Sequence, residues 1–314
     1  MKKAVVTGGT GFIGSWLIEE LLANQVMVLA LVRDKNRLLP EFLENPLFAF
    51  AECDLETEQE ALAPYEDSGY DVFYHLAWGG VSPEHKNEIK TQLQNVSLSI
   101  AAIQVCRRLG CKKMIGIGTV AEYVFCEDVM DVNARQTPND MYGAAKVSAH
   151  YFLEVLAKQY GLPFLWTVIP STFGERRLDS NIITYTIRAL LHGEKPRYGN
   201  LEQMWDFLYV SDVVRALRLI GEKGKPGKTY GIGSGIFKPL KEYIVSIRDS
   251  IDPSLPLGIG ELPAMSGQTT SSCVNIYDLI RDTGFSPRVS FEEGIRRTVR
   301  FLREEHSGDM SRTF

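Results

Sequence analysis

The feature that most constrains the fold is a set of glycines between the first apolar run and the first helical pattern. Residues 4–7 form an apolar, β-branched run, and residues 13–23 carry apolar side chains at helical spacing. Gly8, Gly11 and Gly14 lie three residues apart between them. Glycines so placed allow a tight turn and let a helix pack closely against the preceding strand. The segment therefore predicts a strand, a glycine loop and a helix in immediate succession.

The alternation of strand and helix patterns continues through the first half of the chain. We expect strands at 26–32, 48–51, 71–76, 113–117 and 164–169, and helices at 93–109 and 141–160. Strands separated by helices pair in parallel, and helices cover both faces of their sheet. After Pro170 glycine and proline become frequent, although the tail 291–306 again has helical spacing. The chain is thus expected to be an α/β protein with a doubly wound parallel sheet over residues 1–170, to which some later segments return, and a smaller lobe over 171–314.

Composition excludes several classes of protein. The 314 residues include 34 Lys and Arg against 39 Asp and Glu, a net charge of -5, which disfavours binding to nucleic acid or an anionic membrane. No apolar run approaches the roughly 18 residues of a membrane helix, and the first apolar stretch is too short for a signal peptide. Cysteines stand at 53, 106, 111, 126 and 273 without a C-x-x-C pattern, and the five histidines lack ligand spacing. We expect a cytoplasmic protein with neither a disulfide framework nor a metal site.

The glycine loop has the context of a dinucleotide-binding site. The helix that opens at Phe12, Ile13 and Gly14 would offer free N–H groups and its positive dipole end to a pyrophosphate. Roughly 20 residues further on, the second strand ends at Arg33, which Asp34 follows. Arginine at this position suits the 2′-phosphate of NADP(H), whereas an acidic residue suits the ribose of NAD(H). We expect a Rossmann-type nucleotide site with NADP(H) preferred and NAD(H) possible.

A tyrosine and a lysine one helical turn apart form the candidate catalytic pair. Tyr142 and Lys146 share one face of the expected helix. A phenol titrates near pH 10, and a neighbouring ammonium group lowers that pKa. Thr119 ends the preceding strand, at the sheet edge where such folds bind ligands. We expect Tyr142 to transfer a proton, Thr119 to hydrogen-bond the same substrate oxygen, and Lys146 to bind the ribose and lower the pKa of Tyr142.

Further motifs along nearly the whole chain resemble the extended short-chain dehydrogenase/reductase family of nucleotide-sugar epimerases, dehydratases and reductases. They are residues 7–14, 54–55, 75–77, 95–96, 118–123, 203–212, 283–287 and 291–294. The resemblance implies that Asp54 and Leu55 contact the adenine, although Asp54 could equally cap a turn. It also implies that Leu76, Ala77 and Pro170 lie along the cofactor. His75 is expected to pack at its strand end and not to act as a general base.

The resemblance implies a nucleotide-sugar substrate as well. Its candidate contacts are Trp78, Thr119, Ser171, Asn181 and Trp205. An aromatic face suits a pyranose, but Trp78 could equally be a packing residue. The arginines that bind the substrate diphosphate in the family are replaced here. Four other arginines are therefore candidates for binding the substrate diphosphate: Arg176, Arg177, Arg197 and Arg281.

The two residues after Thr119 discriminate between reactions. The family's 4,6-dehydratases have an Asp-Glu pair there, whereas Val120 and Ala121 cannot transfer protons. The leading hypothesis is therefore a 4-ketoreductase that uses NADPH to reduce a keto group on a nucleotide-linked deoxysugar. The alternatives are a nucleotide-sugar epimerase with retained NAD, a reductase of a non-sugar ketone, and a non-catalytic NADP-binding regulator. By resemblance, the helices at 93–109 and 141–160 would form a homodimer.

Overall fold

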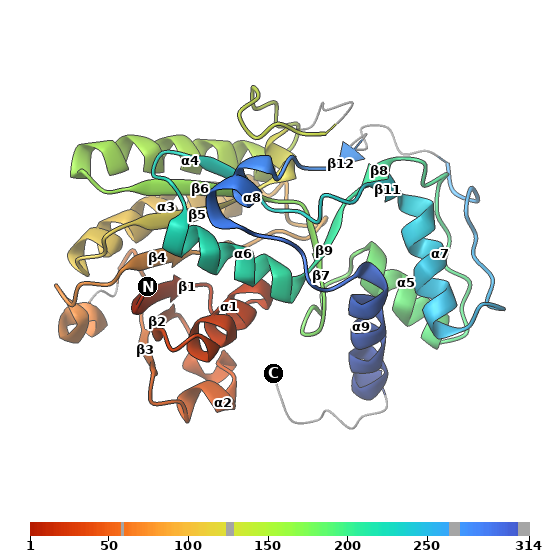
Figure 1. The fold of residues 1–314 in the computed structure, drawn as a ribbon, viewed down its shortest axis with the longest axis horizontal. Coiled ribbons are helices and arrows are strands. Elements are labelled where there is room, and N and C mark those ends of the chain that lie inside the picture. The colour runs from red at the N-terminus through yellow and green to blue at the C-terminus, as the bar shows by residue number, and fades with distance from the viewer. Residues whose placement is uncertain (58–59, 124–128, 264–270, 307–314) are drawn as a thin grey trace.

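A seven-stranded parallel sheet lies at the centre of the protein (Figure 1). The computed structural model describes residues 1–57, 60–123, 129–263 and 271–306. The strand order is β3 (Phe48–Glu52), β2 (Met27–Val32), β1 (Lys3–Thr7), β4 (Val72–His75), β5 (Met114–Thr119), β6 (Phe164–Ile169) and β10 (Thr229–Gly231). The direction of winding reverses between β1 and β4, and ligands bind at such a point, outside the carboxyl ends of the strands.

Helices cover both faces of the sheet (Figure 1). α3 (Ile89–Arg108) and α4 (Met141–Tyr160) pack together on one face. α1 (Phe12–Ala23) and α6 (Val210–Lys223) pack together on the other. Alternate residues of each central strand enter two separate buried clusters, because successive side chains of a strand point to opposite faces. Apolar burial on both faces is what holds this layered arrangement together.

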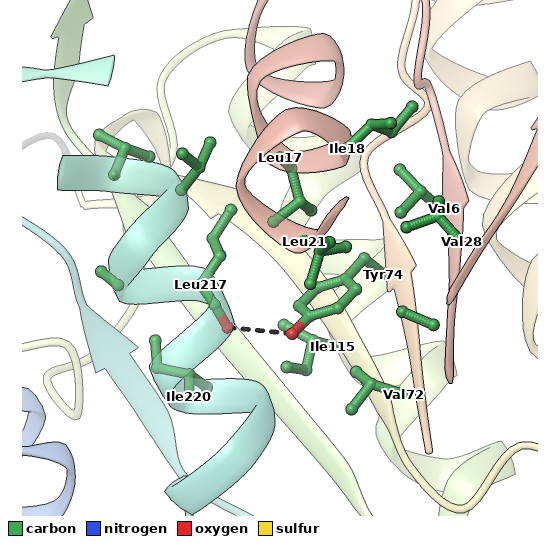
Figure 2. Close-up of a cluster of buried hydrophobic side chains, with 14 of the residues drawn as sticks. Val6, Leu17, Ile18, Leu21, Val28, Val72, Tyr74, Ile115, Leu217 and Ile220 are labelled. Atoms are coloured by element: carbon green, nitrogen blue, oxygen red, sulfur yellow. Dashed lines mark hydrogen bonds between the residues drawn. The ribbon is translucent and has the colours of Figure 1, made fainter. Parts of the chain in front are cut away.

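Tyr74 illustrates how tightly one of these layers is packed (Figure 2). Its ring is completely buried among side chains of α1 and α6, such as Leu21 and Ile220. Its hydroxyl donates a hydrogen bond to the carbonyl oxygen of Leu217, at 3.3 Å. A buried phenol needs such a partner, because an unpaired polar group in the core is costly.

A smaller lobe lies beside the sheet, on the right of Figure 1. β7 (Ser171–Phe173) pairs with β9 (Phe207–Tyr209), and β8 (Met204–Trp205) pairs with β11 (Lys238–Pro239) and β12 (Ser271–Ser272). α5 (Ile182–Leu191), α7 (Leu240–Ile251) and α9 (Phe291–His306) surround a third buried cluster. Phe173 and Phe207 are buried in that cluster, and the partly buried Phe291 packs its ring against both.

The expected α/β fold with a doubly wound parallel sheet is confirmed. The helix expected at 93–109 begins earlier, at Ile89. The seventh strand, β10, follows residue 171 in the sequence but belongs to the central sheet. α6 and α8 (Tyr277–Thr283) also follow residue 171; they contact each other, and α8 contacts β10. The division of the chain at residue 170 stays a proposal.

Among the described residues, four short helices connect the larger elements. The remaining helices are η1 (Lys35–Arg37), α2 (Pro40–Leu43), η2 (Glu60–Tyr65) and η3 (Val120–Glu122). Within the four described ranges, no helix has the length and apolar character needed to cross a membrane. Four of the five cysteines are buried, and Cys126 lies outside the described residues.

Candidate active site

The glycine loop turns sharply between β1 and α1. Gly8 has a φ of +72°, and its carbonyl oxygen accepts from the N–H of Gly11 at 3.0 Å. A Cβ atom on Gly8 would lie 2.7 Å from the nitrogen of Ala77. A Cβ atom on Gly14 would lie 2.0 Å from the oxygen of Gly8. Backbone therefore occupies the space that a side chain would need, as the sequence predicted for the first and third glycines.

The N-terminus of α1 can accept a phosphate group. Gly11 is its N-cap and provides no side-chain acceptor, and the first turn, which begins with Phe12 and Ile13, has no acidic residue. The N–H groups and the positive dipole end of a helix so capped are the features that bind a pyrophosphate. The observed loop thus fits the diphosphate of a dinucleotide.

His75 ties β4 to the glycine loop. Its Nδ1 atom lies 2.9 Å from Oγ1 of Thr7, and its Nε2 atom lies 3.1 Å from Oγ of Ser99. Thr7 Oγ1 in turn accepts from the N–H of Ala77 at 3.2 Å. Burial lowers the pKa of His75 to about 3, so the ring is neutral. His75 positions Leu76 and Ala77 against the loop, in line with the packing role expected from the sequence.

The tips of β2 and β3 carry the residues expected at the adenosine end of the cofactor. Arg33 is exposed and makes no hydrogen bond or ion pair among the described residues. The Asp34 side chain accepts from the N–H of Asn36 at 3.0 Å and so caps η1. Asp54 accepts from the N–H of Glu56 at 2.8 Å, while Leu55 is buried. Asp54 thus makes the turn that the sequence left as its alternative role.

Thr119, Tyr142 and Lys146 come together where β5 ends beside the first turns of α4. Asp140 caps this helix by accepting from the N–H of Gly143 at 2.7 Å. The Thr119 side chain is close enough to the Tyr142 hydroxyl to lower the pKa of that phenol. Nζ of Lys146 donates to the carbonyl oxygen of Ile117 at 2.7 Å. The structure therefore assembles the predicted triad at the carboxyl edge of the sheet.

Burial dominates the electrostatics of this triad. It raises the pKa of Tyr142 to about 12 and lowers the pKa of Lys146 to about 7. Nζ of Lys146 lies 6.0 Å from the centre of the Tyr142 ring, and the groups that lower the Tyr142 pKa are the hydroxyl of Thr119 and the guanidinium of Arg177. The ammonium group of Lys146 is directed to a backbone carbonyl, and a lowering of the Tyr142 pKa by Lys146 stays a prediction.

Trp78 forms one wall of the site. Nζ of Lys146 lies 3.6 Å from the centre of a Trp78 ring, within cation–π distance. The Trp78 ring also meets Tyr142 edge to face, with centroids 6.2 Å apart. Its Nε1 donates to Oε1 of the buried Gln92 at 3.1 Å. Trp78 therefore contacts the catalytic pair and is held in place from behind.

Ser171 of the lobe follows the end of β6, whose Ile169 pairs with Thr119 of β5. Trp205 Nε1 donates to Oγ of Ser171 at 2.8 Å, just beyond Pro170. Asn181 is the N-cap of α5 and accepts from the N–H groups of Ile183 and Thr184, at 3.0 and 3.2 Å. Asn181 thus has a capping role that the sequence analysis did not foresee.

The four candidate arginines form ion pairs with different partners. Arg177 pairs with Asp179 through two hydrogen bonds of 2.7 and 3.0 Å and stacks 5.5 Å from the Phe12 ring centre. Arg176 pairs with Glu19, and Arg197 pairs with Glu261.

Arg281 lies on α8 and pairs with Asp278 and Asp282. Asp282 also binds Lys228, which immediately precedes β10, so Arg281 lies toward the amino end of that strand and away from the triad. Arg281 is therefore removed from the candidates, whereas the charge of Arg177 reaches Tyr142.

Glu122 is the residue of the site that the sequence analysis missed. Its side chain is fully buried, and Oε1 accepts from the N–H of Thr119 at 2.8 Å. Thr119 and Glu122 form the two ends of a capping box around η3. The spacing Thr-x-x-Glu is the signature of such a box, so this contact could have been found in the sequence.

The fold and the site define a class of enzyme. The model of the NAD dependent epimerase/dehydratase family matches residues 4–233. The chain belongs to this family, and the predicted membership of the extended short-chain dehydrogenases/reductases is confirmed. It is accordingly an enzyme of a nicotinamide-dependent class.

Individual relatives resemble the chain over almost its full length. The dTDP-glucose 4,6-dehydratase of Neisseria meningitidis serogroup B is 26% identical over 330 residues, covering 96% of this chain and 93% of the relative. The Homo sapiens dTDP-D-glucose 4,6-dehydratase is 24% identical, covering 96% and 90%.

Solved structures show the same fold. The UDP-N-acetylglucosamine 4-epimerase from Methanobrevibacter ruminantium M1 has a TM-score of 0.85 at 24% identity, covering 97% of this chain and 99% of the other. The UDP-glucuronic acid 4-epimerase from Bacillus cereus in complex with NAD has a TM-score of 0.86 at 20% identity, covering 98% and 99%.

Proposed function

We propose that this protein is an NAD-retaining epimerase that inverts a carbinol centre of a nucleotide-linked sugar. The observation that carries the proposal is the triad of Thr119, Tyr142 and Lys146 without an acid–base pair at Val120 and Ala121. The named relatives are epimerases and dehydratases, whose overall reactions neither gain nor lose electrons. This support places the epimerase above the ketoreductase, which was the leading hypothesis from the sequence.

The chain's own residues supply the proton transfers. The glycine loop and the N-terminus of α1 would hold NAD, which when bound would supply reversible hydride exchange with the substrate carbon. Tyr142 takes the proton of the hydroxyl that becomes a ketone, and gives it back when the ketone is reduced. Thr119 hydrogen-bonds the same oxygen, and Lys146 binds the ribose hydroxyls. Acid–base help of this kind is worth about 10²- to 10⁴-fold in rate.

Further predicted contacts complete the proposal. Gly8, Gly11, Phe12, Ile13 and Gly14 hold the pyrophosphate. The other cofactor contacts are Arg33, Asp54, Leu55, Leu76, Ala77 and Pro170. Trp78, Ser171, Asn181 and Trp205 contact the substrate, and Arg177 is close enough to Tyr142 for its charge to lower the pKa of that phenol.

A 4,6-dehydratase fits the site less well, despite the identity of the relatives. Elimination needs an acid and a base near the sugar, and neither Val120 nor Ala121 can transfer a proton. Glu122 does not replace them. Its two oxygens accept from the N–H of Thr119 and from Gln136 at 2.8 and 2.9 Å, and its side chain is fully buried.

The ketoreductase is kept as a second candidate because of one observation. Arg33 is exposed at the tip of β2 and has no hydrogen-bond or ion-pair partner among the described residues. This is expected of an arginine that binds the 2′-phosphate of NADP(H). NADP(H) would be exchanged in each cycle of such a reductase, whereas an epimerase retains NAD.

We also propose a homodimer formed through α3 and α4. Both helices expose large apolar side chains, including Leu93 and Phe152. Exposed apolar patches of this kind mark contact surfaces. The cytoplasmic location expected from the sequence stays a prediction.

One experiment separates the three reactions. The protein is purified without added cofactor, its dinucleotide is released and identified, and UDP- and dTDP-hexoses are incubated with it in D₂O under NMR observation. We expect about one NAD per chain and a new stereoisomer whose carbon-bound hydrogens are retained. Solvent deuterium at a ring or methyl carbon would indicate elimination. An empty protein that converts a keto sugar only with NADPH would indicate the reductase.

A further inference from the structure

The indole ring of Trp78 lies over the ammonium group of Lys146. Nζ of Lys146 is 3.6 Å from the centre of a Trp78 ring, and it donates to the carbonyl oxygen of Ile117 at 2.7 Å. An aromatic face attracts the positive end of an N–H bond, most strongly when the nitrogen carries a charge. Lys146 is 5% exposed, so little water competes for its N–H groups. The ring and the carbonyl together therefore restrict where this ammonium group can lie.

The same indole meets the second member of the catalytic pair. The ring centroids of Trp78 and Tyr142 lie 6.2 Å apart, and the two ring planes are at 79°. Edge-to-face pairs of this kind are favourable, because the positive edge of one ring meets the negative face of the other. Tyr142 and Lys146 are one turn apart on α4, so one indole contacts both side chains.

Two buried amide side chains of α3 hold this indole from behind. Nε1 of Trp78 donates to Oε1 of Gln92 at 3.1 Å, and Nδ2 of Asn95 donates to the same oxygen at 3.2 Å. Gln92 and Asn95 are both buried. A buried polar group that loses its partner carries the full cost of its desolvation, so this network favours one orientation of the indole.

The two amides also bind the backbone of the loop that carries Trp78. Asn95 accepts from the N–H of Gly79 at 2.9 Å and donates to its carbonyl oxygen at 2.9 Å. Nε2 of Gln92 donates to the carbonyl oxygen of Gly80 at 2.8 Å. Gly80 has a φ of +64°, and a Cβ atom there would lie 2.8 Å from Cγ2 of Thr91. Glycine at this position therefore lets the loop lie close against α3.

We propose that Trp78 is a positioning residue for Lys146: its indole face holds the ammonium group in place, and the buried amide of Gln92 holds the indole. The part that concerns turnover rests on the proposed function. Gln92 touches none of the reacting groups and acts through Trp78. This role is separate from the proposed contact between Trp78 and the sugar.

The consequence for the reaction follows from the role proposed for Lys146. Its ammonium group must lie within hydrogen-bonding distance of the ribose hydroxyls. A misplacement of about 1 Å in an active site can cost about 10²-fold in rate. Loss of the indole face should therefore lower kcat, whereas loss of a sugar contact alone would raise KM and leave kcat unchanged.

The first test observes the contact itself and needs no substrate. Nuclei above an aromatic face are shielded, so the Cε protons of Lys146 should resonate upfield of those of the other lysines. The signal is recorded on the purified protein with ¹³C-labelled lysine and assigned by its loss in Lys146→Arg. We expect Trp78→Leu to abolish the upfield displacement and Trp78→Phe to retain most of it, because phenylalanine keeps an aromatic face.

Two results of this measurement would overturn the proposal. One is a wild-type Lys146 signal within the range of the other lysines. The other is a displacement that persists in Trp78→Leu. Trp78 is only partly buried, so these variants are expected to fold.

Gln92→Leu tests the amide behind the ring. The substitution leaves Nε1 of Trp78 without its acceptor, so the ring should move and the displacement of the Lys146 signal should decrease. Gln94→Leu, an exposed position on the same helix, is the matched control and should leave the signal in place. An unchanged signal in Gln92→Leu would contradict the role of this amide.

Two further variants make the test of Gln92 specific. Trp78→Phe has no indole N–H, so adding Gln92→Leu to it should change the signal less than Gln92→Leu does in the wild type. Equal changes in the two backgrounds would show that Gln92 does not act through Trp78. If Gln92→Leu does not fold, Gln92→Glu replaces it. That variant keeps an acceptor for the indole and should retain the displacement, and its loss would contradict the assigned role.

Turnover tests the part that concerns the reaction. Trp78→Leu and Gln92→Leu should lower kcat per bound NAD by about tenfold. Trp78→Phe should retain more turnover than Trp78→Leu, and Gln92→Leu should leave the KM for the sugar unchanged. An unchanged kcat in both leucine variants, with the displacement lost, would overturn the positioning role in catalysis. A wild type that epimerises no nucleotide sugar contradicts the proposed function alone, because the NMR result does not depend on the reaction.

Discussion

At the scale of single residues, burial sets the protonation of the site. Tyr142 is held neutral and Lys146 is held close to its titration midpoint near neutral pH, in both cases because the charged form has lost its water. Because burial raises its pKa, the Tyr142 phenol holds its proton more tightly than a free phenol and needs help to release it. The hydroxyl of Thr119 and the charge of Arg177 provide part of that help.

Tyr142→Phe tests the proton-transfer step. We expect turnover of the nucleotide sugar to fall by about 10²- to 10⁴-fold, because the acid–base group is lost while the ring remains. The amount of bound NAD should not change. Tyr151→Phe, an exposed position on the same helix, is the matched control and should retain full turnover. Near-wild-type turnover of Tyr142→Phe would refute the assigned role.

His75 predicts how stability depends on pH. Its folded pKa of about 3 lies below the unfolded value of about 6.5, so the unfolded chain binds a proton first as the pH falls. Its contribution to stability is complete above about pH 6.5 and is lost progressively below it, by up to about 1.4 kcal/mol per pH unit. The melting temperature should therefore decrease as the pH is lowered from about 7.5 to about 5.

The decrease should be shallower in His75→Gln, which lacks the titrating ring. Ser99→Ala removes a partner of the ring but keeps its titration, so it should lower stability at every pH without changing the slope. Equal slopes in wild type and His75→Gln would contradict this explanation.

At the scale of the elements, local signals set the ends of α4, while packing decides α3 and β10. α4 spans the predicted 141–160, since Asp140 caps its start and Gly161, with a φ of +63°, ends it. α3 starts four residues earlier than its apolar pattern suggests, at the exposed Ile89. β10 has three residues, too few for a periodic pattern, and its pairing with β6 exists only in the folded sheet.

The outer face of α3 and α4 predicts the oligomeric state. Leu93 is 65% exposed on α3, and Phe152 and Val155 are 52% and 53% exposed on α4. We expect light scattering after size exclusion to give the mass of a dimer, and Leu93→Glu to give a monomer, because a buried charge at the interface is costly. Tyr277→Glu, a 65% exposed position on α8, should leave the dimer intact. A monomeric wild type would refute the proposed interface.

At the scale of the whole molecule, one sheet edge gathers the parts of the site. The loop after β1, His75 at the end of β4 and Thr119 at the end of β5 meet there, because the strands are parallel. The lobe brings Ser171, Trp205 and Arg177 to the same edge. Segments that are far apart in the chain thus form one site, because the doubly wound topology brings the carboxyl ends of these strands to one edge.

Cofactor binding should be visible in the stability of the whole protein. A dinucleotide that binds only the folded state adds about 2.7 kcal/mol at a hundredfold excess over its dissociation constant. We expect NAD to raise the melting temperature of protein stripped of cofactor. Arg33→Ala should weaken binding of NADP and leave that of NAD unchanged, because only the 2′-phosphate would meet the guanidinium. An equal loss of affinity for NADP and for NAD would exclude Arg33 as the residue that binds the 2′-phosphate.

The sequence by itself determined the strand–loop–helix start, the parallel α/β architecture and the spacing that brings Tyr142 beside Lys146 on α4. These follow from local periodicity and from glycines whose Cβ atoms would collide with backbone. Tertiary structure decided the rest. It buried Glu122 behind Thr119, turned the ammonium group of Lys146 toward Ile117, and moved Arg281 away from the site. The physical reason is that pKa values, ion pairs and hydrogen bonds depend on which distant groups share a desolvated volume, and a linear pattern does not contain that information.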